Sequence, residues 1–234
     1  MELCLLIPAK NEASSLPSTL SHYWDTLNSR IPFNFLIIND HSDDDSSEVL
    51  HELSNKYSNL FFVDNNFEGG VGNAIRYGLE VWKGDIVAIC MADGSDSPFD
   101  ILTSYNKICS RQVSCVFGSR FIKGSKIEGY PIAKLILNRI FNFLVKIISS
   151  NKYNDFTNIF KVYQRTAIEA IQPLESTGFS IGLEMSLKAF SKQLKIEIIP
   201  ISWRQRTAGK SKLNLRKNTS LYLNTLIKSI SAKE

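Results

Sequence analysis

The sequence has few cysteines and histidines, and their spacing suits neither a metal site nor a disulfide framework. Four cysteines and three histidines occur among 234 residues. No C-x-x-C pair and no zinc-type combination of His and Cys is present in the sequence. Cys4 and Cys90 lie in short apolar runs that are typical of buried strands. We therefore interpret the cysteines as core residues of a protein in a reducing compartment.

Long hydrophobic runs are also absent. The apolar stretch at residues 3–7 is too short for the core of a signal peptide. No uninterrupted apolar run reaches the length of a transmembrane helix. Residues 132–148 come closest but contain Lys134, Arg139 and Lys146. This pattern predicts an amphipathic helix that lies at a membrane surface, packs on the sheet or forms a dimer contact.

Acidic residues are missing from two stretches of the chain. None occurs between Glu128 and Asp155, and none occurs between Glu197 and Glu234, although the formal net charge is only +4. The segment from about residue 204 to 234 is therefore basic, and we expect it to attract phosphate or anionic lipid. No aromatic interleaving or helix-turn-helix pattern accompanies these charges, so we expect no nucleic-acid partner.

Short apolar runs alternate with helical stretches, which predicts an α/β fold with a mostly parallel central sheet and helices on both faces. No break in composition marks a linker, so residues 1–234 are interpreted as one domain with a basic amphipathic segment at its C-terminal end. The predicted strands are 3–8, 35–38, 60–63, 85–91, 115–118, 159–163 and 196–199, and the predicted helices are 16–27, 47–57, 71–82, 101–110, 132–148 and 182–190.

Three of these strands are followed by polar segments rich in carboxylates, at residues 8–12, 39–45 and 91–96. In doubly wound sheets, ligands bind outside the carboxyl ends of the strands. Clustered acids repel one another unless a cation or hydrogen-bond donors neutralise them. The three segments therefore indicate a binding site at this edge of the sheet.

Two carboxylates in these segments are candidate ligands. Asp93 follows an apolar strand and fits a Mg²⁺ or Mn²⁺ ion that bridges a diphosphate, although Asp, Gly and Ser also favour a plain turn. Asp40 follows the second strand, where its carboxylate would accept hydrogen bonds from a base or ribose. The acids at 43–45 fit the N-terminal capping of the next helix instead.

Glycines and basic residues form two further candidate segments. Gly69, Gly70 and Gly72 open a predicted helix and would let the backbone approach a ligand closely. The spacing is neither that of a P-loop nor that of a dinucleotide-binding strand and turn. Residues 204–212 alternate basic and small side chains, which suits either a phosphate clamp or a solvated basic loop.

In their order along the chain, these segments resemble the family-2 glycosyltransferases, and most closely the dolichyl- or polyprenyl-phosphate mannose synthase branch. Met91 departs from the pattern, because it occupies the place of the first Asp of the D-x-D motif. The D-x-T segment that begins at Asp155 lacks the glycine that often follows it. The segments that carry the resemblance are 7–12, 37–44, 68–74, 91–98, 118–120 with Gly124, and 206–212.

The resemblance implies a GT-A fold and inverting transfer of a hexose from a GDP- or UDP-linked sugar, with Mg²⁺ or Mn²⁺ as cofactor. It also implies a polyprenyl phosphate acceptor, peripheral contact with the cytoplasmic face of a membrane, and an oligomeric or membrane-anchor partner. The implied nucleotide-binding residues are Pro8, Ala9, Asn11, Glu12, Asp40, Gly70 and Ala92. The implied metal ligands are Asp93 and either Ser95 or Asp96, the phosphate contacts are Arg120, Arg139, Ser211 and Lys212, and the catalytic residues are Asp93, Arg206 and Lys212.

Two alternatives remain at this point. If the acceptor is a hydroxyl of a soluble molecule or glycan, a carboxylate must take its proton, and Glu184 or Asp155 is the candidate base. Either residue is equally suited to a structural role, Glu184 in the first turn of a helix and Asp155 as a cap. The second alternative is a nucleotide-binding module without transferase activity, because the D-x-D motif is incomplete.

Overall fold

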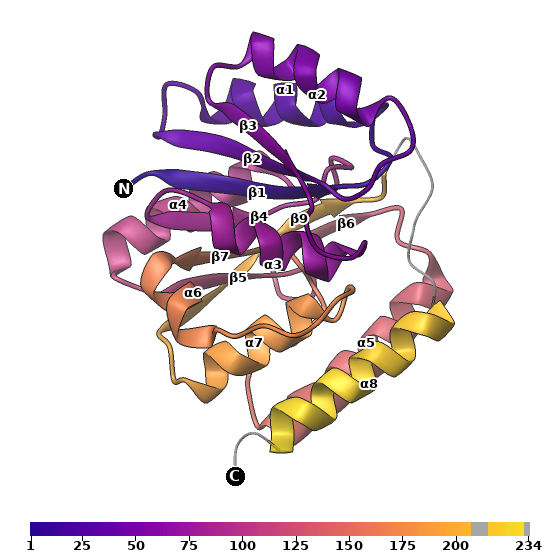
Figure 1. The fold of residues 1–234 in the computed structure, drawn as a ribbon. Helices are drawn as coiled ribbons and strands as arrows, with labels where there is room; N and C mark the ends of the chain where they lie inside the picture. The colour runs from indigo at the N-terminus through magenta and orange to yellow at the C-terminus, as the bar shows by residue number, and fades with distance from the viewer. Residues whose placement is uncertain (207–214, 232–234) are drawn as a thin grey trace.

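The computed structural model describes residues 1–206 and 215–231, with the side chains of 1–206 and 220–229. Its strands are β1 (Leu3–Ala9), β2 (Phe33–Asn39), β3 (Leu60–Asp64), β4 (Ile86–Ile89), β5 (Cys115–Ser119), β6 (Lys126–Glu128), β7 (Lys161–Gln164), β8 (Ile196–Pro200) and β9 (Ser202–Arg204). Its helices are α1 (Leu16–Leu27), α2 (Ser46–Lys56), α3 (Val71–Val81), α4 (Pro98–Arg111), α5 (Ile132–Ser149), α6 (Arg165–Ile171), α7 (Ile181–Ser191) and α8 (Leu215–Ser231) (Figure 1).

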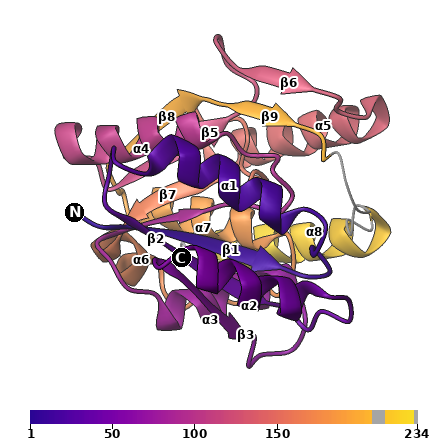
Figure 2. The same ribbon diagram turned by 90° about the horizontal axis from the view of Figure 1, so that it is seen from above.

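The central sheet has the strand order β3-β2-β1-β4-β7-β5-β8. Only β7 runs antiparallel to its neighbours, so the predicted α/β fold with a mostly parallel sheet is confirmed. Strands β6 and β9 form a separate parallel pair at one side of the molecule (Figure 2). Each predicted strand and helix is present within a few residues of its predicted bounds. The short elements β6, β9 and α6 were not predicted.

Helices cover both faces of the sheet, as expected. One hydrophobic core contains residues of α1, α2 and α4, and the other contains residues of α3, α6 and α7. In Figure 1, α1 and α2 lie above the sheet and α7 lies below it. Strand β1 contributes Leu3, Leu5 and Ile7 to the first core and Cys4 and Leu6 to the second. A strand that is buried on both faces must be apolar throughout, which explains its unbroken hydrophobic run.

The chain reverses its direction across the sheet at β1. From β1 it passes to β2 and β3 on one side, and after α3 it returns to β4 on the other side of β1. The helices that follow β1 and β3 therefore lie on opposite faces. Such a reversal leaves a crevice at the carboxyl ends of the two neighbouring strands, β1 and β4.

Three ionisable side chains are buried near the carboxyl end of β5. The Arg120 guanidinium donates to both carboxylate oxygens of Asp155, at 2.8 and 2.7 Å, and the Arg120 backbone N–H donates at 3.0 Å. The Lys161 ammonium donates to the carbonyls of Phe156 and Asn158. These bonds hold the segment before β7 against β5. Burial lowers the pKa of Lys161 to about 7.

The lowered pKa of Lys161 predicts a specific pH dependence of stability. Between about pH 7 and 10.5 the unfolded chain binds a proton at this lysine that the folded chain does not. The contribution of Lys161 to the free energy of unfolding is therefore fully present above pH 10.5. It is lost progressively as the pH falls from 10.5 through about 7. The free energy of unfolding of the wild type should rise with pH, relative to Lys161→Met, by about 1 kcal/mol per unit in this window.

Urea unfolding of both proteins at several pH values between 7 and 10 measures this difference. All other titrating groups are common to the two proteins, so they cancel. The exposed Lys152 provides a matched control, because Lys152→Met should give a stability profile parallel to that of the wild type. Parallel profiles for Lys161→Met and the wild type would contradict the prediction.

Candidate functional site

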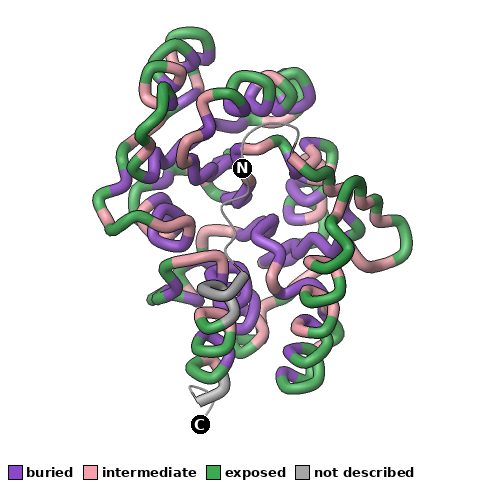
Figure 3. Tube along the Cα trace, turned by 90° about the vertical axis from the view of Figure 1, so that its right-hand side faces the viewer, coloured by how far each residue is buried: buried purple, intermediate pink, exposed green. Residues whose placement is uncertain are grey.

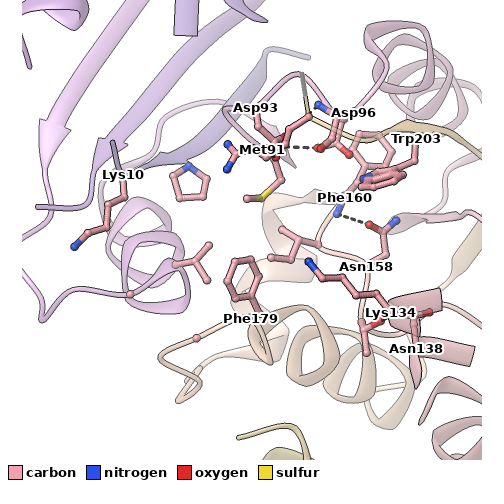
Figure 4. Close-up of a pocket in the computed structure, with 18 of the residues that line it drawn as sticks. Lys10, Met91, Asp93, Asp96, Lys134, Asn138, Asn158, Phe160, Phe179 and Trp203 are labelled. Carbon is pink, nitrogen blue, oxygen red and sulfur yellow. Dashed lines mark hydrogen bonds and ion pairs between the residues drawn. The ribbon is translucent and has the colours of Figure 1, made fainter. Parts of the chain in front are cut away.

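A cavity of about 630 Å³ opens at the carboxyl ends of β1, β2 and β4. This size is typical of sites that bind small molecules. In Figure 4, Lys10 lies at one end of the cavity, Lys134 and Asn138 lie at the other, and Asp93 and Asp96 lie between them. The polar segments that the sequence places after three strands therefore meet at one site.

Asp40 lies directly after β2, in the wall of the cavity. Its carboxylate accepts the Gly70 N–H at 2.9 and 3.1 Å and the Asn65 side-chain amide at 2.8 Å. Only 3% of Asp40 is exposed, yet it contributes to the cavity wall. Asp40 thus ties the end of β2 to the loop before α3 and presents buried negative charge to the cavity.

Arg206 connects two other carboxylates of the cavity. Its Nη2 lies 2.7 Å from both carboxylate oxygens of Glu12, and its Nε lies 3.6 Å from Oδ2 of Asp93. The Ser15 hydroxyl also donates to Glu12, at 2.7 Å. One guanidinium therefore lies between carboxylates from the ends of β1 and β4, where a charged ligand would compete for the same groups.

The cation ligands implied by the resemblance differ in their environment. Asp93 accepts the Ser95 N–H at 3.1 Å, and 18% of its side chain is exposed. Burial raises the pKa of Asp96 to about 7, and one oxygen of Asp96 accepts the Met91 N–H at 2.9 Å. A cation at Asp96 would compete with a proton, so Asp93 is the better ligand.

A divalent ion at this site would need ligands from outside the protein. In residues 1–206 and the described part of α8, no group of three His, Cys, Asp or Glu side chains is arranged to hold a metal. Mg²⁺ is commonly bound through one or two carboxylates together with substrate phosphates. The exposed part of Asp93 fits such a shared ion.

Gly70, which precedes α3, and Gly72, in the first turn of α3, approach backbone of the same chain. A Cβ atom at Gly70 would lie 2.5 Å from the Thr177 carbonyl oxygen, and one at Gly72 would lie 2.4 Å from the Ser176 carbonyl oxygen. The Gly70 φ of +149° also favours glycine. The sequence predicts close approach to a ligand, whereas the group approached in the structure is the segment before α7. Gly70 itself also lines the cavity.

The other end of the cavity is formed largely by residues that sequence reasoning missed. Lys134 and Asn138 of α5 line it together with Tyr130 and Thr157. The Asn138 amide donates to the Thr157 hydroxyl at 2.8 Å, which ties α5 to the segment before β7. The spacing of four residues, which places Lys134 and Asn138 on one helix face, was the available signal.

The two arginines expected at phosphates are engaged within the protein. Burial disfavours the charged form of Arg120, but the Asp155 carboxylate outweighs burial and raises its pKa. Arg120 still reaches the cavity wall. Arg139 lies outside it, where its guanidinium donates to the Asn154 carbonyl at 2.9 Å and lies 4.2 Å from the centre of the Phe121 ring.

Both candidate bases are engaged away from the cavity. Asp155 is fully buried in its ion pair with Arg120. Glu184 lines a separate cavity, and its carboxylate accepts the backbone N–H groups of Glu175 and Ser176. Glu184 lies in the first turn of α7, as the structural alternative expects, whereas Asp155 forms an ion pair with Arg120 in place of the expected cap.

The remaining expected residues divide into three groups. Asn11 and Ala92 lie outside the cavity lining, because Asn11 is hydrogen bonded to Asp43 and the Ala92 carbonyl accepts the Thr19 hydroxyl. Ser211 and Lys212 lie outside the described residues. The expected residues that line the cavity are Pro8, Ala9, Glu12, Asp40, Gly70, Asp93, Ser95, Asp96, Arg120 and Arg206.

Solved structures share this fold. The glucosyl-3-phosphoglycerate synthase of Mycobacterium tuberculosis, in complex with Mn²⁺, uridine diphosphate and glucosyl-3-phosphoglycerate, superposes with a TM-score of 0.74. It is 13% identical, and the match covers 98% of this chain and 80% of that one. A complex of the same enzyme with Mg²⁺ and uridine diphosphate gives a TM-score of 0.73 at 13% identity, over 98% and 79% of the two chains. The likeness confirms the expected GT-A fold.

Sequence comparison identifies relatives along most of the chain. The dolichol-phosphate mannosyltransferase of Pyrococcus furiosus is 24% identical over 215 residues, which are 91% of this chain and 59% of that protein. The undecaprenyl-phosphate mannosyltransferase of Micrococcus luteus is 24% identical over 221 residues, which are 92% of this chain and 88% of that protein. The model of glycosyl transferase family 2 matches residues 4–172. With its fold, its cavity at the strand ends and this match, the chain belongs to the family-2 glycosyltransferases.

Proposed function

We propose that the protein transfers a hexose, with inversion, from a GDP- or UDP-linked sugar to a polyprenyl phosphate at the cytoplasmic face of a membrane. The observation that carries the proposal is the continuity of the cavity from the carboxylates at the strand ends to Lys134 on α5, a helix with an exposed apolar face. The two mannosyltransferases that resemble this chain are named for dolichol phosphate and undecaprenyl phosphate.

The donor nucleotide would occupy the half of the cavity formed by β1, β2 and α3. Asp40 would accept hydrogen bonds from the base or ribose, and the backbone at Pro8 and Ala9 would form the adjoining wall. Arg206 would leave Glu12 and Asp93 to meet the diphosphate, because a guanidinium binds phosphate in the same paired geometry as carboxylate. Arginine at this point would stabilise the charge that develops on the leaving diphosphate.

Asp93 would hold a Mg²⁺ or Mn²⁺ ion together with the diphosphate oxygens. When bound, such an ion supplies positive charge that stabilises the departing diphosphate. Structural neighbours contain Mn²⁺ or Mg²⁺ with uridine diphosphate, which supports this assignment.

The acceptor phosphate would lie near Lys134 and Asn138. A phosphate monoester is an anion near neutral pH and needs no general base, whereas a hydroxyl acceptor does. The engagement of Glu184 and Asp155 within the protein therefore supports the phosphate acceptor. Lys134 would take the role that the sequence assigned to Arg139, because Lys134 lines the cavity and Arg139 does not.

Helix α5 supports a lipid acceptor through its surface. Lys134 of this helix lines the cavity. No acidic residue occurs between Glu128 and Asp155, so every charged side chain of α5 is basic. Basic residues near an anionic surface contribute about 1 kcal/mol each. No helix in the described part of the chain is long and apolar enough to span a bilayer. The exposed apolar residues of α5 are Ile132, Ile136, Leu137, Ile140, Phe143, Leu144, Ile147 and Ile148, and those among the described side chains of α8 (220–229) are Leu223 and Ile227.

A transfer assay with three acceptors tests the proposal. Radiolabelled GDP- and UDP-sugars with Mg²⁺ or Mn²⁺ are offered a polyprenyl phosphate, the same polyprenol without phosphate, or a water-soluble glycan. We expect label to enter the organic phase only when polyprenyl phosphate is the acceptor. Transfer to the glycan instead would establish the hydroxyl acceptor, and nucleotide binding without transfer to any acceptor would establish a binding module.

Asp93→Asn should lower the rate of transfer about 100-fold or more, since the charge that holds the cation contributes several kcal/mol to the transition state. The fold should remain, because the amide still accepts the Ser95 N–H. Initial rates at saturating metal measure the effect. Asp25→Asn, an exposed carboxylate on α1, provides the control and should keep full activity. A rate for Asp93→Asn near that of the wild type would rule out the metal role.

Asp40→Ala should weaken binding of UDP or GDP about tenfold, which corresponds to one charge-assisted hydrogen bond. Titration calorimetry measures the affinity directly. Asp64→Asn is the matched control, because Asp64 ends the neighbouring strand, bonds to Asn39 and lies outside the cavity lining. The control should bind nucleotide like the wild type. Unchanged affinity in Asp40→Ala, for every nucleotide that the wild type binds, is the outcome that excludes this contact.

The apolar face of α5 predicts reversible binding to membranes. The protein should float with anionic vesicles at low salt and be released at high salt, because salt screens the basic residues. Replacing Ile140 and Phe143 by Glu should abolish flotation. Phe61→Glu, an equally exposed apolar residue on β3, should leave flotation unchanged. A wild type that stays at the bottom of the gradient and forms dimers through α5 would show that a second copy covers this face.

A further inference from the structure

The segment between α6 and α7 forms part of the donor side of the cavity. Thr177, Gly178 and Phe179 line the cavity wall, yet they belong to no helix or strand. The wall therefore depends on what holds this segment in place. Its backbone is bonded on one side to α7 and on the other side to the N-terminus of α3.

Glu184, in the first turn of α7, holds the beginning of the segment. Its Oε1 accepts the Glu175 N–H at 2.9 Å, and its Oε2 accepts the Ser176 N–H at 2.7 Å. Lys188, one turn further on, lies 2.8 Å from Oε1. Burial alone would raise the pKa of Glu184, but the hydrogen bonds from Lys188 and from the two N–H groups lower it. Glu184 therefore binds the segment as a buried carboxylate, by charge-assisted hydrogen bonds.

The next residue of the segment holds α3. The Thr177 carbonyl accepts the Gly72 N–H at 3.0 Å and the Asn73 N–H at 3.3 Å. These are N–H groups of the first helical turn, which have no partner within the helix itself. The contact needs glycine, because a Cβ atom at Gly70 or Gly72 would lie within 2.5 Å of a backbone oxygen of the segment.

The same contact sets the position of Asp40. Gly70 immediately precedes α3, and its N–H donates to the Asp40 carboxylate at 2.9 Å. A continuous path of hydrogen bonds and backbone thus runs from Glu184 through Ser176 and Thr177 to α3, and from Gly70 to Asp40. Every step is either a bond of 3.3 Å or less or a link between adjacent residues.

We propose that Glu184 is a positioning residue, which fixes the segment at 175–179 and, through it, the N-terminus of α3 and the donor half of the cavity. The proposal rests on the function proposed above, in which this half holds a nucleoside diphosphate. Glu184 itself touches neither donor nor acceptor. Its replacement therefore loosens the donor site and leaves the reacting groups unchanged.

Glu184→Gln is the test variant, because it keeps the shape of the side chain and removes its charge. We expect the KM for the nucleotide sugar and the Kd for UDP or GDP to rise about tenfold, the equivalent of one charge-assisted hydrogen bond, while kcat changes less than twofold. Glu175→Gln is the control, since Glu175 lies in the same segment but its carboxylate is exposed and bonded to Lys228. The control should match the wild type in KM, Kd and kcat.

Hydrogen exchange provides a readout that needs neither ligand nor transfer. In Glu184→Gln the amides of Gly70, Gly72 and Asn73 should exchange faster, together with those of Glu175 and Ser176, while the amides of β1 keep their rates. A protein without transferase activity would still show this pattern, so failure of the proposed function and failure of the positioning role are distinguishable. If only the amides of Glu175 and Ser176 exchange faster, the path to α3 does not exist and the proposal is overturned.

The wild type gives a second measurement if Glu184→Gln fails to fold. The five amides should then open together, with the same free energy and the same dependence on denaturant, as one cooperative unit. Opening of the α3 amides independently of the segment overturns the proposal. So does a fall of kcat at constant KM with loss of the acidic limb of the pH profile in Glu184→Gln, because that result assigns Glu184 to proton transfer.

Discussion

The cost of burying negative charge governs this site. The carboxyl ends of β1, β2 and β4 bring Glu12, Asp40 and Asp93 into one cavity, and each needs a positive or hydrogen-bonding partner because an unpaired buried carboxylate is strongly disfavoured. Arg206 forms an ion pair with Glu12 and lies near Asp93, whereas Asp40 accepts hydrogen bonds from a backbone N–H and a side-chain amide. Asp155 and Glu184 are paired away from the cavity. Asp40 both faces the cavity and ties the end of β2 to the loop before α3.

The strands and their polar ends could be predicted because both follow from local sequence. A parallel strand that is buried on two faces requires an uninterrupted apolar run, and the polar residue that ends the run marks the edge of the sheet. This reasoning located Asp40 and Asp93 within the cavity wall. It overestimated the strand before Asp93, because Met91 leaves the sheet where Asp96 takes the Met91 N–H, although the Cys90 N–H still donates to the Leu6 carbonyl of β1.

The remaining features depend on contacts between distant parts of the chain. The local sequence shows that Lys188 follows Glu184 by one helical turn, but it does not show that the other partners of Glu184 are backbone N–H groups eight and nine residues earlier in the chain. The glycines at the start of α3 indicate close approach, but the sequence does not show that the approaching group is the carbonyl of Thr177, more than 100 residues later. Strands β6 and β9 have three residues each, too few for any periodicity to show.

Helix α5 departs from the usual arrangement of an amphipathic helix, although Val145 is buried in the core. A helix on the surface of a globular protein normally buries its apolar stripe and exposes its polar residues. In α5 the fully buried residues include Asn142, which bonds to Thr157, and Lys134 and Asn138 line the cavity, while Ile136, Ile140 and Phe143 are more than half exposed. This arrangement supports the proposed acceptor, whose phosphate would enter the cavity and whose hydrocarbon chain would stay in lipid. A water-soluble acceptor would account for the polar residues on the inner face of this helix but not for the exposed apolar residues on its outer face.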